Sequence, residues 1–199
     1  INTDGNKWDG LIDRNLVADR IGVIKPSKPV AYIHPPAPKT RQVPSIVKIK
    51  DLKGDATRGK MVSARCMMCH KVDDQGQEFG PSLNGWAKER SIDETLNAII
   101  NPDADLAHGF HSSRVELKNG EFIDGLVKSG RERAWHFVNI KDGDSYLVIK
   151  TSGGITQKIS WRYIKSVKDS KRSMMLYPES LGLSQAQDFA DLAAYLKTL

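Results

Sequence analysis

The sequence contains little cysteine and no long apolar run. Only two of its 199 residues are cysteines, and they stand three positions apart. Because no second cysteine pair follows, the further ligands that a structural zinc site needs at finger-like spacing are missing. No stretch of about 18 consecutive apolar residues occurs, so no segment is expected to span a membrane. The first residues, from Ile1 to Gly5, are polar and do not resemble a signal peptide.

The composition is that of a soluble globular protein. Apolar residues make up 39% and charged residues 27% of the chain, which is long enough for one large domain or for one domain with an appendage. The formal net charge is +6 and the pI is about 9.3. A basic balance of this kind fits nucleic acid, an anionic membrane or an acidic protein as partner, and it also fits an ordinary solvated surface.

The two cysteines belong to the stretch Cys66-Met67-Met68-Cys69-His70, the C-x-x-C-H signature of covalent haem attachment. Two thiols on one side of a helical turn can add to the two vinyl groups of a porphyrin, and His70 is then delivered to the iron. A thioredoxin-like dithiol explains the pattern less well, because such a dithiol would stand in a βαβ unit and would leave His70 without a role. The sequence therefore predicts one covalently attached haem c, with His70 as an iron ligand.

Covalent haem attachment also predicts a compartment. Haem c is attached on the outer side of the energy-transducing membrane, so we expect a mature, exported chain, periplasmic, whose leader is absent from this sequence. A nucleic-acid partner is not expected there, while a lipid anchor stays open. The basic charge is then interpreted either as steering towards an acidic protein or as a solvated surface.

Residues 1–50 differ in composition from the rest of the chain. Six of the nine prolines fall among the first 44 residues, which favours extended or polyproline II backbone. We expect an arm or tether, either a linker to a membrane anchor or an arm that wraps the domain or docks a partner. The apolar residues between Trp8 and Arg20 are compatible with a short helix.

Three helices are predicted around the haem motif. Asp55 is placed to cap a helix that runs through Met61 towards Cys66, and Gly59 inside it indicates a close crossing with another helix. Ser91 and Glu94 form a capping box for a helix that stops at Asn101-Pro102. The last helix carries an apolar face of helical period, and the residues Ser184-Gln185-Ala186-Gln187 form a capping box before it. We expect this last helix to be the one that Gly59 approaches.

The apolar period changes from helical to alternating between about His111 and Val167. Val115–Lys118 and Glu121–Asp124 flank Asn119-Gly120, a strong hairpin signal. Further strands are predicted at the following places: His136–Ile140 and Tyr146–Ile149 around a turn at Asp142-Gly143, Ile155–Ile159, and a short strand near Val167 after Trp161–Ile164. About five short strands in fewer than 60 residues predict a small antiparallel barrel or sandwich.

A larger pattern joins these segments: Gly54-Asp55 with Gly59, the haem motif, Gly80-Pro81 with Leu83, Asn101-Pro102, Gly109, the β segment, and Asp191-Leu192 with Tyr195-Leu196. Over residues 52–199 the chain resembles the c-type cytochrome domain of the Planctomycetes and Verrucomicrobia, the Pirellula/Verrucomicrobium-type haem-binding domain. The resemblance implies a mainly α, class I-like cytochrome c fold over residues 51–110 and 169–199. The antiparallel β barrel or sandwich is then an insertion at residues 111–168, and residues 1–50 are an extended N-terminal arm.

The resemblance also implies a distal methionine ligand. Family members usually read Ser-Leu-Met-Pro-Glu before the final helix, whereas this chain reads Ser173-Met174-Met175-Leu176-Tyr177-Pro178-Glu179, with the proline displaced by two residues. Counting back from Ser184 places Met175 at the ligand position, whereas pairing on the proline places Tyr177 there. We expect His70 and Met175 to bind the iron, with Met174 or Tyr177 as alternatives and His108 or His111 as competing ligands. Met174 and Met175 as core filler is the other interpretation.

Other residues are placed around the haem by the same resemblance. The Pro81 carbonyl is expected to accept a hydrogen bond from the His70 ring, and Leu83 to pack on the porphyrin. Trp86 is a further candidate for packing nearby. Arg90 and Trp161 are candidates for approaching a propionate, and each is equally compatible with a core or surface role.

These predictions together favour an electron carrier rather than an enzyme. An iron with both a histidine and a methionine ligand has no open position, and methionine raises its potential relative to two histidines. The resemblance implies separate redox partners, with a dehydrogenase as donor and an oxidase or another cytochrome as acceptor. Lys165, Lys168, Lys171 and Arg172 are expected near the haem edge, either steering an acidic partner or simply solvated. The alternatives are an open distal site that reduces peroxide or senses a gas, and a docking subunit of a dehydrogenase complex.

Overall fold

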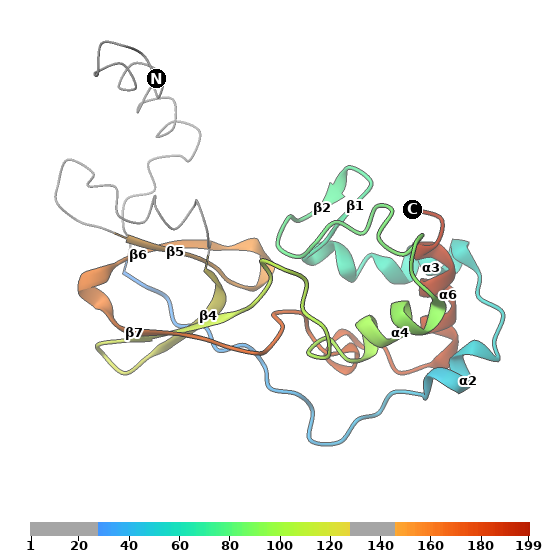
Figure 1. The fold of residues 1–199 in the computed structure, drawn as a ribbon, viewed down its shortest axis with the longest axis horizontal. Coiled ribbons are helices and arrows are strands. Elements are labelled where there is room, and N and C mark those ends of the chain that lie inside the picture. Colours follow the sequence, from blue (N-terminus) through green and yellow to red (C-terminus); the bar gives the residue numbers. More distant parts are fainter. Residues whose placement is uncertain (1–27, 128–145) are drawn as a thin grey trace, which may run out of the picture.

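The computed structural model describes residues 28–127 and 146–199 of the chain. Its helices gather at one end and an antiparallel sheet forms the other, with residues 28–45 running along one side from the sheet to the first helix (Figure 1). Three predictions fall outside the described residues: the helix at Trp8–Arg20, the strand at His136–Ile140 and the turn at Asp142-Gly143. Within the described part, no helix is both long enough and apolar enough to cross a membrane.

The helical end is held together by one apolar core. Leu96, Phe189 and Leu192 are almost completely buried in it, and Ile49 joins them from the proline-rich segment. Burying one such side chain stabilises the fold by roughly 1.5–3 kcal/mol. The helices that contribute are α2 (Ile46–Lys50), α3 (Ala56–Ser63), α4 (Ile92–Ile100) and α6 (Ala186–Leu196).

Helices α3 and α6 cross at backbone contact, as the glycine in α3 predicts. A Cβ atom at Gly59 would overlap the carbonyl oxygen of Asp191, and one at Gly54 would overlap that of Ala190. Only glycine lets the two helix backbones approach this closely. The prediction that Gly59 meets the last helix is therefore confirmed, and the crossing fixes the helix that leads into the haem motif against the end of the chain.

The helix caps agree with the sequence at two of three ends. The Asp55 carboxylate accepts from the backbone N–H groups of Thr57 and Arg58, and Ser91 with Glu94 forms the complete capping box. The box predicted at Ser184 is wrong, because α6 begins after Gln185, whose side chain makes no cap hydrogen bond. In a capping box the Gln187 side chain would fold back onto Ser184. Instead, its amide donates to the Lys53 carbonyl at 3.0 Å and to Asp191 at 2.8 Å.

The buried carboxylate of Asp191 ties α6 to the start of α3. It accepts from Arg58 Nε at 2.7 Å, from the Asp55 backbone N–H at 2.7 Å and from the Gln187 amide. These bonds, led by the one from Arg58, hold the pKa of Asp191 below its usual value although burial opposes them. The carboxylate is therefore bound in its charged form.

We expect Asp191→Asn to destabilise the helical end by about 2 kcal/mol at pH 7, the scale of hydrogen bonds to a charged group. Because the folded pKa of Asp191 is lowered, its contribution is complete above the pKa of an unfolded aspartate, about 3.9, and is lost as the pH falls through the folded value. Denaturant unfolding should therefore show a difference in unfolding free energy between the wild type and Asp191→Asn that is constant above about pH 5 and shrinks below pH 4. A difference that does not change with pH would contradict a charged Asp191.

The β segment forms one five-stranded antiparallel sheet in the order β6-β5-β4-β3-β7. The hairpin predicted at Asn119-Gly120 is confirmed, with Gly120 at φ 86°. The apolar side chains of the strands, including Val115, Ile123 and Ile149, form a second core separate from that of the helices. The strands are β3 (Ser113–Leu117), β4 (Phe122–Val127), β5 (Tyr146–Lys150), β6 (Thr156–Ser160) and β7 (Ile164–Asp169).

This sheet is strongly curled. Strands β6 and β7 lie at opposite edges, yet only three residues, Trp161–Tyr163, separate them. Such a link reaches at most about 14 Å, whereas the outer strands of a flat five-stranded sheet lie about 19 Å apart. Strand β4 bends to allow this: its first half pairs with β3 and its second half with β5, and Gly125 lies at the change, against the Lys150 backbone. The predicted small antiparallel barrel or sandwich is not confirmed, because the pairing of the described strands is an open row.

Part of the proline-rich segment packs against this sheet. Tyr32 pairs with the free side of β4, exchanging backbone hydrogen bonds with Phe122 and Asp124, and the His34 N–H donates to the Asp124 carboxylate at 2.9 Å. Arg114 holds the same carboxylate through two hydrogen bonds, at 2.7 and 2.8 Å. Residues 28–45 thus follow the molecule from its sheet to α2 instead of standing away from it.

Candidate functional site

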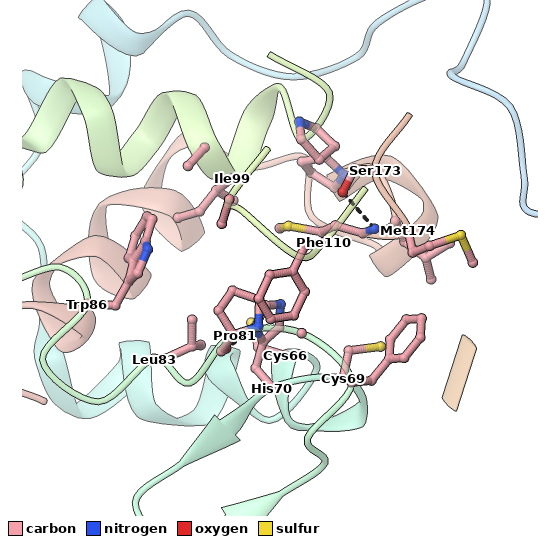
Figure 2. Close-up of a pocket in the computed structure, with 18 of the residues that line it drawn as sticks. Cys66, Cys69, His70, Pro81, Leu83, Trp86, Ile99, Phe110, Ser173 and Met174 are labelled. Carbon is pink, nitrogen blue, oxygen red and sulfur yellow. Dashed lines mark hydrogen bonds between the residues drawn. The ribbon is translucent and has the colours of Figure 1, made fainter. Parts of the chain in front are cut away.

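A cavity of about 340 Å³ lies between the helical end and the sheet, within the size range of cofactor sites. Its walls are mainly apolar and come from parts of the chain that are far apart in sequence. Figure 2 shows Cys66, Cys69, His70 and Pro81 on one side and Ser173 with Met174 facing them, while Phe110 projects into the space between. Leu126 of β4 also lines the cavity, so the sheet closes part of it.

The two cysteines stand on a single tight turn directly after α3. Cys66–Met68 forms a 3₁₀ turn, and the backbone N–H groups of Cys69 and His70 both donate to the Cys66 carbonyl, at 3.0 and 2.8 Å. Both thiols are free. Burial raises the pKa of the Cys66 thiol to about 11 against the opposing charge of Arg65, and burial also raises the pKa of Cys69. The turn therefore presents two neutral thiols beside one imidazole.

The His70 ring is fixed from two directions. Its Nδ1 atom lies 2.7 Å from the Pro81 carbonyl oxygen, the hydrogen bond that the resemblance implies. Gly80 packs so closely on the ring that a Cβ there would lie 2.5 Å from a ring carbon. Burial lowers the pKa of His70, which the bond to Pro81 opposes. An Nδ1 atom that donates to a carbonyl leaves Nε2 with its lone pair, the tautomer of a metal-binding histidine.

Side chains of the loop after the motif form the apolar side of the cavity. Leu83 is 8% exposed and Trp86 is partly buried, and both line the cavity. Arg90 also lines it and lies over the Trp86 ring at 4.4 Å. Trp161 is not among the lining residues and packs against the core of the sheet. Of the two candidates for a propionate, only Arg90 is therefore at the cavity.

The loop at residues 173–178 brings two methionines to the facing wall. Asp103 holds this loop by accepting from the Ser173 backbone N–H at 2.6 Å and from the Tyr177 hydroxyl at 2.9 Å. Met174 and Met175 line the cavity, whereas Tyr177 does not, because its hydroxyl is turned to Asp103. His108 and His111 are exposed and are also not among the lining residues. The geometry thus brings together the haem motif and the methionines, but not the other distal candidates.

The basic residues before this loop have different surroundings. Lys165 pairs with Glu116 at 2.7 Å, and Arg172 donates to the Pro35 carbonyl at 2.6 Å. Lys168 and Arg172 line a smaller polar cavity of about 290 Å³ instead of the main one. None of Lys165, Lys168, Lys171 and Arg172 lines the main cavity. The cavity lining therefore does not support their expected position at the haem edge.

Phe110 and Leu126 line the cavity but were not predicted from the sequence. Phe110 stands in a turn beside Gly109, and Leu126 lies in a strand whose alternation indicates only that it faces some core. No periodicity relates either residue to the haem motif. Their position depends on how the sheet is placed against the helices.

The donor set of this cavity fits a covalently bound haem. It offers two adjacent thiols, one imidazole with a fixed ring, a thioether on the facing wall and an apolar surface between them. Residues 56–122 match the model of the cytochrome c family. This part of the chain is similar to cytochrome c domains. The match implies covalently bound haem c with its iron, and a single cysteine pair corresponds to one haem.

A curated relative points the same way. A cytochrome c-553-like protein of Synechocystis sp. (strain ATCC 27184 / PCC 6803 / Kazusa) is 34% identical over 58 residues, which are 29% of this chain and 54% of that protein. The chain spans about half the length of this relative. The similarity leaves most of this chain outside it.

Proposed function

We propose that the chain is a monohaem c-type cytochrome that carries single electrons between exported redox proteins. The observation that carries this proposal is the placing of one C-x-x-C-H turn opposite a methionine-bearing loop across an apolar cavity. When bound, the haem iron supplies one-electron oxidation and reduction. Residues of this chain bind and orient the haem and exclude water from it.

Cys66 and Cys69 would hold the porphyrin by thioether bonds, and His70 would bind the iron through Nε2. Pro81 orients the imidazole, because its carbonyl fixes the Nδ1–H and with it the tautomer. Leu83 would pack on the porphyrin, with Trp86 beside it, and both would exclude water from the iron. A dry site lowers the cost of rearranging solvent when the charge of the iron changes, which suits electron transfer.

Met175 is the proposed second ligand, in preference to Met174. A sulfur that bonds a group in the cavity must present surface to it. Met174 is only 4% exposed and borders both the main cavity and the smaller polar one, whereas Met175 is partly exposed and lines the main cavity alone. A thioether ligand favours reduced iron and raises the potential.

The proposed surroundings follow from these ligands. If His70 and Met175 both bind the iron, no position on it would be left for substrate, so the chain would act as an electron carrier and not as an enzyme. We infer that a dehydrogenase is the donor and that an oxidase or another cytochrome is the acceptor, in the periplasm or another exported compartment. The order of segments favours the Planctomycetes and Verrucomicrobia type of cytochrome domain, with the haem domain divided around the β segment.

The ligand assignment is tested by comparing Met175→Ala with the matched variant Met174→Ala. We expect the sulfur-to-iron charge-transfer band in the near-red spectrum of the oxidised protein to disappear in Met175→Ala, because only that change removes the ligand. Reduced Met175→Ala should bind carbon monoxide, while the wild type should not. Met174→Ala should keep the band and lose about 2–5 kcal/mol of stability from its buried site.

Two outcomes would contradict the proposal. If Met174→Ala loses the band instead, the distal ligand is the neighbouring methionine. If the wild type lacks the band and binds carbon monoxide readily, the iron has an open position, and the carrier function proposed here is wrong.

A further inference from the structure

The loop that carries the two methionines has little secondary structure of its own. Between β7 and α6 the described chain makes only one short 3₁₀ turn, Pro178–Leu181. The methionines precede this turn, so regular backbone hydrogen bonding does not fix their position. Contacts from outside the loop must therefore hold it, and Asp103 supplies only some of them.

Further contacts come from the proline-rich segment, which passes the loop on its way from the sheet to α2. We use the name strap for residues 30–42 of this segment. At one end of the strap, backbone bonds join Tyr32 to β4 (Figure 1). At the other end, the Arg41 guanidinium lies over the Tyr177 ring of the loop and binds Glu179 directly after it. Both ends of the strap are anchored, so the strap can hold the loop in place.

His34 of the strap lies beside the methionine loop. It is 3% exposed and lines the smaller polar cavity together with Ser173 and Met174 of the loop. His34 is itself fixed by its backbone N–H on Asp124, and its Nδ1 atom lies 3.4 Å from the Tyr32 hydroxyl. Its buried ring is therefore a fixed side chain next to the residues that precede and carry the proposed ligand.

Arg41 holds the same loop a few residues further on. Its Nε donates to Glu179 at 2.7 Å, its NH1 to Asn101 at 3.2 Å and its NH2 to the Ile100 carbonyl at 2.6 Å. The guanidinium also lies over the Tyr177 ring at 4.8 Å. One side chain thus joins the loop to the C-terminal end of α4, and only the forked guanidinium offers donors in this arrangement.

We propose that His34 and Arg41 are positioning residues that hold the Met175 loop in the geometry required for binding iron. This inference rests on the proposed function, because it takes Met175 as the ligand. The strap acts on the iron only through that methionine. Losing either contact lets the loop move away from the cavity, so that outside ligands compete more easily for the iron and the potential falls.

The experiment measures how tightly imidazole and cyanide bind the oxidised holoprotein, together with the charge-transfer band and the reduction potential. The variants His34→Leu and Arg41→Met remove the contacts. His34→Gln restores an amide donor on a side chain of similar reach. The controls are Lys39→Ala, an exposed residue of the same strap, and Asp191→Asn, which weakens the helical end at the contact between α3 and α6.

We expect His34→Leu and Arg41→Met each to bind imidazole and cyanide about fivefold more tightly, the factor for losing one hydrogen bond of ordinary strength. Their band should weaken and their potential should fall. His34→Gln should return towards the wild type in all three measurements. Lys39→Ala should match the wild type, and Asp191→Asn should lose stability while its ligand affinity stays unchanged.

The outcomes separate the inference from the proposed function. If Met175→Ala loses the band but both strap variants bind imidazole and cyanide like the wild type, the strap inference is wrong and the carrier function stands. If Asp191→Asn changes ligand affinity as much as the strap variants do, the effect is one of general stability and the inference is likewise wrong. If Met175→Ala keeps the band, the ligand assignment fails and the inference fails with it.

Discussion

Replacing Cys66 and Cys69 together by serine is expected to abolish covalent haem attachment. The two sulfurs are the only cysteine sulfurs in the chain, and a serine hydroxyl does not add to a porphyrin vinyl group to form a thioether. A denaturing gel stained for haem should show a band for the wild type and none for the double variant. Each single variant should keep one thioether bond, which mass spectrometry detects as haem still linked to the peptide.

The matched control for this experiment lies within the same motif. Met68 stands between the two cysteines and is 52% exposed, so Met68→Ser changes the motif without removing a sulfur that bonds the porphyrin. It should retain full covalent attachment. Haem that survives denaturation on the double variant would mean that another residue forms the link, and the assignment of Cys66 and Cys69 would be wrong.

Gly59→Ala is expected to cause the largest loss of stability of any methyl-sized change in the helical end. The added Cβ would overlap the Asp191 carbonyl. A backbone atom of a packed helix cannot move to relieve this clash unless the helix moves with it. Overpacking of this kind costs about 3 kcal/mol, which outweighs the gain of about 1 kcal/mol from alanine in a helix. Denaturant unfolding of the holoprotein, followed by circular dichroism and by the haem absorption, measures the difference.

Lys60→Ala is the control for that substitution. Lys60 is the next residue of α3 and its side chain is exposed, so the change should alter stability by no more than about 0.5 kcal/mol. If Gly59→Ala were as stable as the control, α3 and α6 could separate at little cost. The close crossing would then not be what holds the haem motif in place.

The two cores explain how this molecule can hold a haem between its parts. The helices and the sheet each bury their own apolar side chains, and the cavity lies where they meet. Residues from the haem motif, from the loop after α4, from β4 and from the segment before α6 all reach it. A cofactor in this cavity would lie at the junction of segments far apart in the chain, so its binding should stabilise their mutual position.

Local signals in the sequence determined the haem motif and most helix and strand ends. Cys66, Cys69 and His70 are identified by spacing alone, because their chemistry needs nothing beyond one turn of backbone. Asp55, Ser91 and the Asn119-Gly120 turn act through bonds within a few residues, which is why those predictions are confirmed. The capping box at Ser184 was wrong for a related reason: Gln187 had a better partner in Lys53, a residue distant in sequence.

Only the tertiary structure decided how these pieces meet. The curl of the sheet comes from placing β6 and β7 at opposite edges with three residues between them, a pairing order that alternation cannot reveal. The position of the strap depends on hydrogen bonds of His34 and Arg41 to residues about 60 to 140 positions away, on β4, at the end of α4 and directly after the methionine loop. Sequence patterns report the period of a segment and the ends of an element, whereas contacts between distant segments depend on the whole chain having folded.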